Sequence, residues 1–505
     1  MTPSKLILDQ SILVSDDLLL NHKRCSRRAY LDTFADTTQR DPEKDFVRKL
    51  KQESYQHVTQ VLAQTVYHRP DGDRHNYQER ARQTEALMSQ GVDCIYKGVL
   101  QQPGDDNLGW LLESLTGQAT PIDWQQITLV GEPMLLVKQS GWSRFGDWYY
   151  SPVNIKLGRR PKPEYKLLAA FHAYLLAFVQ GVLPPQSELI LREGKTYGVQ
   201  LDVWLCRLQQ AIRESTQMLF SQKEPEVFIS RQRCSLCQWY SYCHDVAQSV
   251  AHISLIPGVT PSRYRQMKIL GINSVEALAS VTIPQISEEI DTEITHQLKQ
   301  QALSILENRP LLKSSLPDEV FVPTAPIELY FDIEAEPDLN LDYLLGIVLV
   351  NHETNSQEFY PFFAKTPAEE ELIWQQFLEF VELYPQAPIF HFSEYEVETL
   401  KRLATLYDTS SDRLEALINR SVDLHHQVII SVIFPVESYS LKSLANWLGF
   451  QWRDQGISGD QCICWYDEWL ENGDESIKEA IFRYNEDDCR ATFVLKDWLV
   501  NFLPM

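Results

Sequence analysis

The sequence contains no long uninterrupted run of apolar residues. Its longest apolar stretch, residues 167–183, carries His172 and Gln180, so it predicts a buried helix rather than a membrane span. The start of the chain also lacks the basic segment and continuous apolar block of an export signal. We therefore expect a cytoplasmic protein without a membrane partner. Its 505 residues, 44% of them hydrophobic, predict about two to four domains with buried cores.

Cysteine is scarce, with nine residues in the whole chain. Disulfide scaffolds belong to small secreted domains dense in cysteine, so this content disfavours one. Five cysteines have no partner at metal-ligand spacing, and we expect them to be reduced thiols: Cys94, Cys206, Cys462, Cys464 and Cys489.

Positive charge is also scarce, but only in the second half. Residues 1–250 hold 29 Lys and Arg against 28 Asp and Glu, whereas residues 251–505 hold 17 against 41. The net charge of −23 argues at first against a nucleic-acid partner. Basic residues nevertheless bunch at 22–28, 156–166 and 231–233, where they could meet phosphates or simply form a solvated surface.

The remaining four cysteines form a candidate metal centre. Cys234, Cys237 and Cys243 follow a Cys-x2-Cys-x5-Cys spacing, one ligand short of a tetrahedral site, and Cys25 in a basic segment is the candidate fourth. Such a set would close a loop of about 200 residues and act as a clasp. Four thiolates suit zinc or a 4Fe–4S cluster equally. The alternatives are a short zinc knuckle or three thiols without a metal.

This cysteine pattern resembles the iron–sulfur RecB-type nucleases, including the CRISPR-associated four-cysteine exonucleases, which implies a PD-(D/E)XK core. Such a core places carboxylates on two neighbouring strands to hold Mg²⁺, with a lysine beside them. Residues 131–158 have the strand, turn and strand pattern, but Met134 and Asn154 occupy the positions of the two acids. Only Lys156 remains.

Two further positions fit the same resemblance in part. Tyr174 matches the tyrosine of a Gln-x3-Tyr motif whose first position is Ala170 here, and His57 matches an upstream histidine. Because neutral side chains cannot hold a hard cation, we expect this nuclease site to be inactive and the domain to bind nucleic acid. Asp147 or Glu132 could restore metal binding through a shifted frame.

Residues 255–281 predict two short helices around Gly271, with Asn273 or Ser274 capping the second. The pattern resembles a helix-hairpin-helix, which grips phosphates through main-chain N–H groups. A plain helical spacer is the alternative.

The acidic half opens with the segment IELYFDIEAEPD, residues 327–338. Strand alternation places Asp332 and Glu334 on one face, and Phe331 and Ile333 on the other. Taken alone, this pattern indicates an amphipathic strand with a wet acidic face.

Two later segments add candidate ligands. Tyr484 and Asp488 are four residues apart in a predicted helix, so they share one face. Glu396 lies at the start of a helix that follows a short apolar strand in residues 389–403.

These residues, in this order, resemble the DEDDy branch of the DnaQ-like 3′–5′ exonucleases, whose carboxylates hold two divalent cations, Mg²⁺ or Mn²⁺. The resemblance implies that Asp332 and Asp488 bind metal directly and that Glu334 holds metal and water. It also implies that Tyr484 orients the nucleophile. Glu396 stands where the family has Asp, so a water-mediated contact is expected.

The whole chain resembles a bacterial family of RecB-like nucleases, which implies an α/β protein of three parts. These are a restriction-endonuclease-like domain (1–250), a helical hairpin with a linker (251–315) and an RNase H-like domain (326–505). The implied function is 3′–5′ exonucleolytic cleavage of DNA, single-stranded, in repair or recombination. The alternative is a non-catalytic nucleic-acid-binding or scaffold protein in which both sites have decayed.

Overall fold

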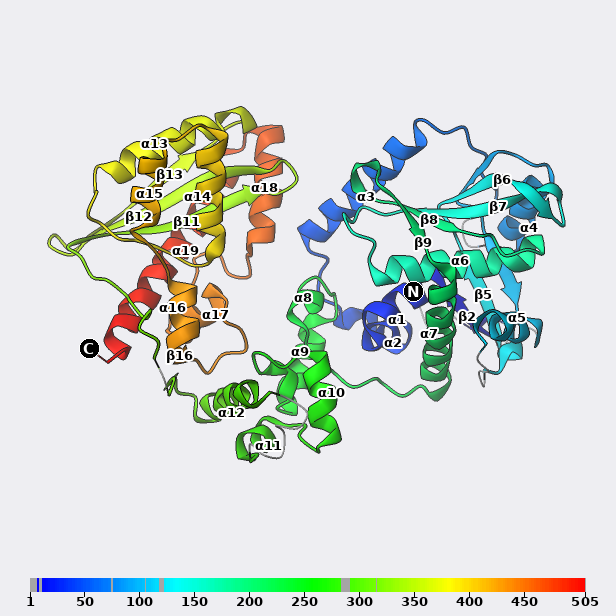
Figure 1. The fold of residues 1–505 in the computed structure, drawn as a ribbon, viewed down its shortest axis with the longest axis horizontal. Helices are drawn as coiled ribbons and strands as arrows, with labels where there is room; N and C mark the ends of the chain where they lie inside the picture. Colours follow the sequence, from blue (N-terminus) through cyan, green and yellow to red (C-terminus); the bar gives the residue numbers. More distant parts are fainter. Residues whose placement is uncertain are drawn as a thin grey trace. The chain divides into compact units, whose positions relative to one another are not determined.

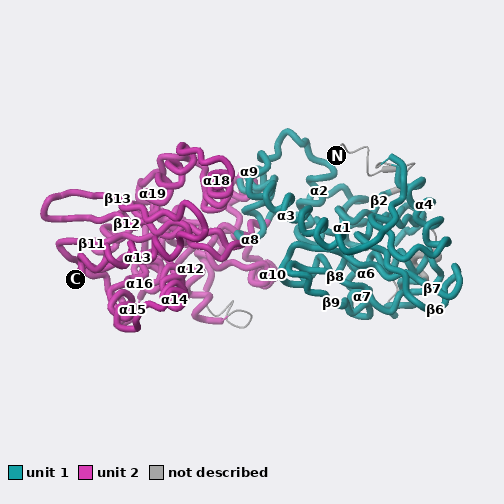
Figure 2. The backbone as a smooth tube through the Cα atoms, turned by 90° about the horizontal axis from the view of Figure 1, so that it is seen from above, with its two compact units in different colours: residues 1–227, 231–244 teal, residues 228–230, 245–505 magenta. Residues whose placement is uncertain are grey.

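The computed structural model describes most of the chain, in these ranges: 7–8, 11–73, 76–104, 106–117, 122–282, 291–314 and 316–504. Two compact units divide it, as Figure 2 shows: unit 1 contains residues 1–227 and 231–244, and unit 2 contains residues 228–230 and 245–505. Within the described ranges, no helix combines the length and the apolar character that crossing a membrane requires.

Unit 1 contains a mixed five-stranded sheet with the order β3-β6-β7-β8-β9, in which only β7 and β8 pair in parallel. Its strands are β3 (Cys94–Tyr96), β6 (Leu135–Ser143), β7 (Gly146–Ile155), β8 (Ser187–Ile190) and β9 (Thr196–Val199). A second sheet has the order β1-β2-β5-β4. Its strands are β1 (Ile7–Leu8), β2 (Ser11–Ser15), β4 (Leu100–Pro103) and β5 (Ile127–Gly131).

Helix α6 (Pro163–Gln180) is the buried centre of unit 1, which confirms the expectation of a buried helix in the longest apolar stretch. Proline at its first turn fits a position where the N–H has no helical partner, and Gly181 ends it with φ of 76°. The other helices of this region are α1 (Asp16–Arg24), α2 (Ser26–Phe34), α3 (Asp45–Leu62), α4 (Tyr77–Ser89), α5 (Asp106–Thr116), α7 (Leu201–Ser221), α8 (Arg231–Cys234) and α9 (Tyr240–Ser249).

Unit 2 begins with three helices: α10 (Pro261–Ile269), α11 (Val275–Ser280) and α12 (Thr292–Glu307). The two short helices predicted around Gly271 are present, with Gly271 at φ of +77° and Ser274 as the cap of α11. Helix α12 is tied to the following domain, because the Gln301 amide and the Ser304 hydroxyl donate to the main-chain oxygens of Phe434 and Ile433.

The main sheet of unit 2 has the order β13-β12-β11-β14-β15. Its strands are β11 (Ile327–Glu336), β12 (Leu341–Asn351), β13 (Ser356–Phe363), β14 (Ile389–His391) and β15 (Ser421–Asp423). The first three pair antiparallel, and β14 and β15 continue in parallel from β11. A small ladder joins β10 (Leu311–Leu312) to β16 (Val432–Ile433).

Helices cover both faces of this sheet (Figure 1). Leu329 and Phe331 of β11 share a core with Phe377 and Leu400 on one face, whereas Tyr330 packs with the helices of the other. The helices are α13 (Glu370–Glu382), α14 (Glu394–Leu406), α15 (Ser411–Ile418), α16 (Leu424–Ser431), α17 (Leu441–Trp447), α18 (Gly459–Asn472) and α19 (Glu475–Phe502).

Candidate active site

The acidic side of strand β11 is buried, so the expectation of a wet acidic face is wrong. Glu334 is 6% exposed and Glu336 is 2% exposed. The reason is that α19 packs over the face that carries Tyr330, since Tyr330, Leu495 and Leu499 belong to one core cluster. Asp332 and Glu334 share that face, because they alternate with Phe331 along the strand.

Helix α19 supplies the opposing residues. Its first turn is capped by Asp474, whose carboxylate accepts a hydrogen bond from the main-chain N–H of Ser476. Tyr484 and Asp488 lie within the helix, one turn apart on one face, as their spacing predicts.

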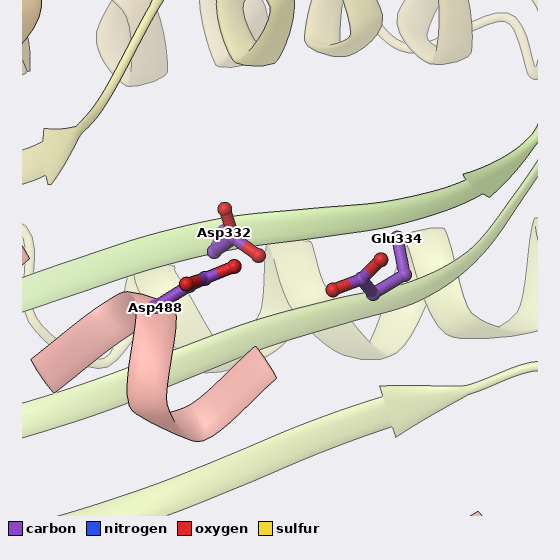
Figure 3. A group of neighbouring side chains, drawn as sticks. All are labelled: Asp332, Glu334 and Asp488. Carbon is purple, nitrogen blue, oxygen red and sulfur yellow. The ribbon is translucent and has the colours of Figure 1, made fainter. Parts of the chain in front are cut away.

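Asp332, Glu334 and Asp488 converge from β11 and α19, as Figure 3 shows. One ligand oxygen from each lies within 4.8 Å of the others, and Asp332 and Asp488 keep some exposure to solvent. They form the single such group of Asp, Glu, His or Cys side chains among the described residues. Two oxygens on one Mg²⁺ can be at most about 4.2 Å apart, so small side-chain adjustments let this donor set fit a hard divalent cation.

Burial and mutual repulsion dominate the electrostatics of this carboxylate group. Burial raises the pKa of Asp332 well above its usual value, and Asp488, Glu334 and Glu396 raise it further. Burial also raises the pKa of Glu334, again with Asp488 adding to the effect. A bound cation would remove this repulsion, which is the physical reason that such a group suits a metal.

Asp488 has two partners that favour its charged form, Trp452 and Lys442. Burial raises its pKa to about 7, but the indole N–H of Trp452 donates to its Oδ1 at 2.7 Å, and the Lys442 cation opposes the increase. The Lys442 ammonium lies 5.2 Å from the ring centre of Trp452 and 5.4 Å from that of Tyr484. The sequence reasoning missed both Trp452 and Lys442.

Tyr484 is a protonated hydroxyl at any physiological pH. Burial raises the pKa of Tyr484, and the charges of Asp488 and Glu334 raise it further. Its hydroxyl also forms a hydrogen bond with Asp488. The side chain can therefore donate a hydrogen bond at the site without becoming a base.

Glu396 does not belong to the carboxylate group. It lies in the first turn of α14, 5% exposed, where Ser393 donates to its Oε2 at 2.8 Å. Ser393 itself has φ of 152°, a strained value for a non-glycine residue. The charge of Glu396 reaches Asp332, because it contributes to the raised pKa of that residue.

The four candidate cysteine ligands all lie in unit 1. Cys25 separates α1 from α2, and Arg233 beside Cys234 donates to the main-chain oxygen of Arg24 at 3.3 Å. Burial raises the pKa of Cys243 to about 11, Arg27 opposes this increase, and the charges of Cys237 and Cys25 add to it. No three of the sulfur atoms lie within 4.8 Å of one another among the described residues.

None of the nine cysteines, all of which the structure describes, forms a disulfide.

The structure describes every position of the expected inactive nuclease site. Met134 packs with Val58 and Val153 in a small apolar cluster, and Tyr174 is buried in the main core. Asn154 is 2% exposed, and its Nδ2 has no hydrogen-bond partner in the described part of the chain. The same holds for Nε2 of His57 on α3.

Lys156 faces acids that the sequence reasoning did not assign to it. Burial lowers the pKa of Lys156, and the carboxylates of Asp16 and Asp17 oppose this decrease. Oδ1 of Asp16 in turn forms a hydrogen bond with Nε2 of His172 at 3.0 Å. An aspartate pair after a serine reads as an ordinary helix start, which hid this cluster.

Neither acid of the shifted frame belongs to the group of Asp332, Glu334 and Asp488. Glu132 pairs with Arg80 at 2.5 Å, and Asp147 is exposed on the β6–β7 hairpin.

The sheet and its helices form an α/β domain, and its carboxylate group offers the oxygen ligands that a divalent cation takes. Residues 329–500 match the family model of the RNase H superfamily, so unit 2 contains an RNase H-like domain. A domain of this superfamily indicates a nuclease-type function that acts on nucleic acid with divalent metal ions. No curated protein matches the chain.

Proposed function

We propose that the protein is a divalent-metal-dependent 3′–5′ exonuclease that shortens single-stranded DNA in repair or recombination. The observation that carries the proposal is the convergence of Asp332, Glu334 and Asp488 within 4.8 Å, from segments more than 150 residues apart. The RNase H-like match at residues 329–500 supports the reaction class. The polarity and the DNA substrate rest on the resemblance to the DEDDy exonucleases.

In this proposal each side chain has one task. Asp332 and Asp488 bind metal directly, and Glu334 holds metal and the attacking water. The Tyr484 hydroxyl, which stays protonated, orients this water. Glu396 contributes through a bridging water, which its place outside the 4.8 Å group favours. Mg²⁺ or Mn²⁺, when bound, activates water and stabilises the leaving oxygen.

A gel assay tests this proposal. A single-stranded DNA oligonucleotide labelled at its 5′ end is incubated with the full-length protein and Mn²⁺. The wild type is expected to produce a ladder of products shortened from the 3′ end, and Asp332→Asn none. Glu353→Gln, which changes an exposed acid in the β12–β13 turn, is the matched control and should cleave as the wild type does. An Asp332→Asn variant that cleaves normally would overturn the proposal.

We propose in addition that unit 1 is a nucleic-acid-binding module with an inactive nuclease site, closed by a 4Fe–4S cluster or zinc on Cys25, Cys234, Cys237 and Cys243. The grouping of these thiols in unit 1 supports it. Cleavage that is abolished by Lys156→Ala but untouched by Asp332→Asn would contradict the inactivity of this site.

The second candidate function is a non-catalytic nucleic-acid-binding or scaffold protein. The observation in its favour is that Met134 and Asn154 stand at the two positions where the resemblance to the PD-(D/E)XK nucleases expects acids. The same oligonucleotide decides between the two, because a scaffold binds it and leaves it intact in the presence of Mn²⁺.

A further inference from the structure

A glycine lies directly opposite the first acid of the site. Gly346 on β12 pairs with Asp332 on β11 in the middle of the sheet. Glycine weakens a central strand, and its presence there often marks a close approach by another group. That group is Asn485, because a Cβ atom on residue 346 would lie 1.6 Å from Asn485 Oδ1.

The Asn485 side chain is held in one orientation. It is fully buried, and its Nδ2 donates to Asp332 Oδ2 at 2.8 Å and also forms a hydrogen bond with Glu334. Its Oδ1 points to Gly346 and accepts no hydrogen bond in the described part of the chain. Turning the amide around would set a carbonyl oxygen against two carboxylates, so the N–H groups must face the acids.

Because Oδ1 of Asn485 accepts no hydrogen bond from any described residue, the side chain destabilises the fold at this point, which calls for a functional reason. A buried acceptor without a donor destabilises the fold. Asn485 lies three residues before Asp488 on α19, so both face β11 from the same side of the helix. The amide therefore lies beside the metal-binding group without being a ligand, since its oxygen points away from the acids.

We propose, resting on the metal-dependent activity proposed above, that Asn485 is a positioning residue of the carboxylate centre and that Gly346 provides the space for it. Asn485 fixes the rotamers of Asp332 and Glu334 through its side-chain N–H groups, so that their other oxygens face Asp488. Groups that orient metal ligands in this way typically change metal affinity about 10- to 100-fold when removed.

Calorimetric titration of the full-length protein with Mn²⁺ tests this role directly. Asn485→Leu keeps the size of the side chain but removes its donor, and we expect Mn²⁺ binding weaker by about 10- to 100-fold. Thr492→Val is the matched control, because Thr492 is buried on the same helix and donates only to the main-chain oxygen of Asp488. It should bind Mn²⁺ as the wild type does. Unchanged Mn²⁺ affinity in Asn485→Leu would overturn the proposal.

A second pair of variants covers the case in which a single change prevents folding. Gly346→Ala collides with Asn485, and Gly346→Ala combined with Asn485→Ala relieves the collision. We expect the double variant to regain the melting temperature lost by Gly346→Ala but not the Mn²⁺ affinity. A double variant that regains both would reduce Asn485 to a packing residue and overturn the proposal.

The outcomes for this inference and for the proposed function are separable. A wild type that binds Mn²⁺ but cleaves no oligonucleotide disproves the exonuclease, while a weaker affinity of Asn485→Leu still supports the positioning role. A wild type that binds no Mn²⁺ overturns both.

Discussion

Asp332, Glu334 and Asp488 are held so close that, without a cation, they cannot all carry a charge at low energetic cost. Each of the three has a pKa above its usual value because of burial and the neighbouring charges. The three carboxylates therefore destabilise the metal-free fold, and a bound cation would remove this destabilisation.

The metal-free protein should lose stability as the pH rises. Asp488 has a pKa of about 7 in the fold against 3.8 ordinarily, so between about pH 4 and about pH 7 the folded state binds more protons than the unfolded one. Stability therefore falls across this window, and the raised pKa values of Asp332 and Glu334 act in the same direction. Melting temperatures in EDTA at several pH values check this. Asp488→Asn should flatten the decrease, and an equally steep decrease would contradict the account.

Replacing one acid of the site by a neutral residue should lower the cleavage activity and raise the stability of the metal-free protein. We expect Asp332→Asn to lower cleavage by more than about 100-fold, beyond the loss typical of residues around a metal site. It should also raise the metal-free melting temperature above neutral pH, because it removes one of three repelling charges. Scanning calorimetry in EDTA measures this increase. A lower melting temperature would mean that Asp332 has a mainly structural role.

At the scale of single residues, the sequence predicts the ionisable side chains of the site better than its neutral ones. Asp332, Glu334 and Asp488 were predicted because their order and spacing resemble those of the DEDDy exonucleases, and the fold brings them together. Asn485 and Trp452 were missed, since neutral side chains acquire their role only from what they touch. A glycine such as Gly346 in a strand interior can signal the close approach of another group, but the sequence does not show which group approaches it.

At the scale of elements, one buried ion pair fastens α19 to β11. Lys496 of α19 bonds Glu328 of β11 at 2.5 Å, with the two side chains 4% and 0% exposed. Tyr330 and His352 complete the hydrogen bonds of Glu328. The pair matters to the site because the same two elements carry the carboxylates.

Removing one partner should destabilise unit 2 strongly. Lys496→Met leaves the Glu328 charge buried without its lysine partner, a change that typically costs about 3–5 kcal/mol. The double variant Glu328→Gln with Lys496→Met should recover much of this loss. Calorimetry resolves the transition of unit 2 by its shift on adding Mn²⁺. A single variant as stable as the double variant would show that the ion pair contributes little.

Strand β11 and helix α19 also show which structural features the sequence pattern does not predict. The alternation in β11 correctly predicted a strand and its faces, but not that helices cover both faces. The strand pattern gives no sign of the partners of Glu328, because His352 and Lys496 are distant from it in the chain. The predicted helix around Tyr484 is confirmed, but it is longer than the motif, as α19 runs from Glu475 to Phe502.

At the scale of the whole molecule, the cysteines of unit 1 provide a separate test. If they hold a cluster, Cys25→Ser should remove the visible absorption and the bound iron or zinc of the purified protein. Cys206→Ser, which changes a thiol on α7 without ligand spacing, should leave both intact. Metal analysis of the two variants measures this, and equal metal content in both would exclude Cys25 as a ligand.

The central claim is that residues from two distant segments of unit 2 form one cation site. Titration of the full-length, metal-free protein with Mn²⁺ in a calorimeter tests it most directly. We predict saturable binding in the wild type that is lost in both Asp332→Asn and Asp488→Asn, because β11 and α19 each supply ligands to the same ion. Binding that survives either change undiminished would contradict the account.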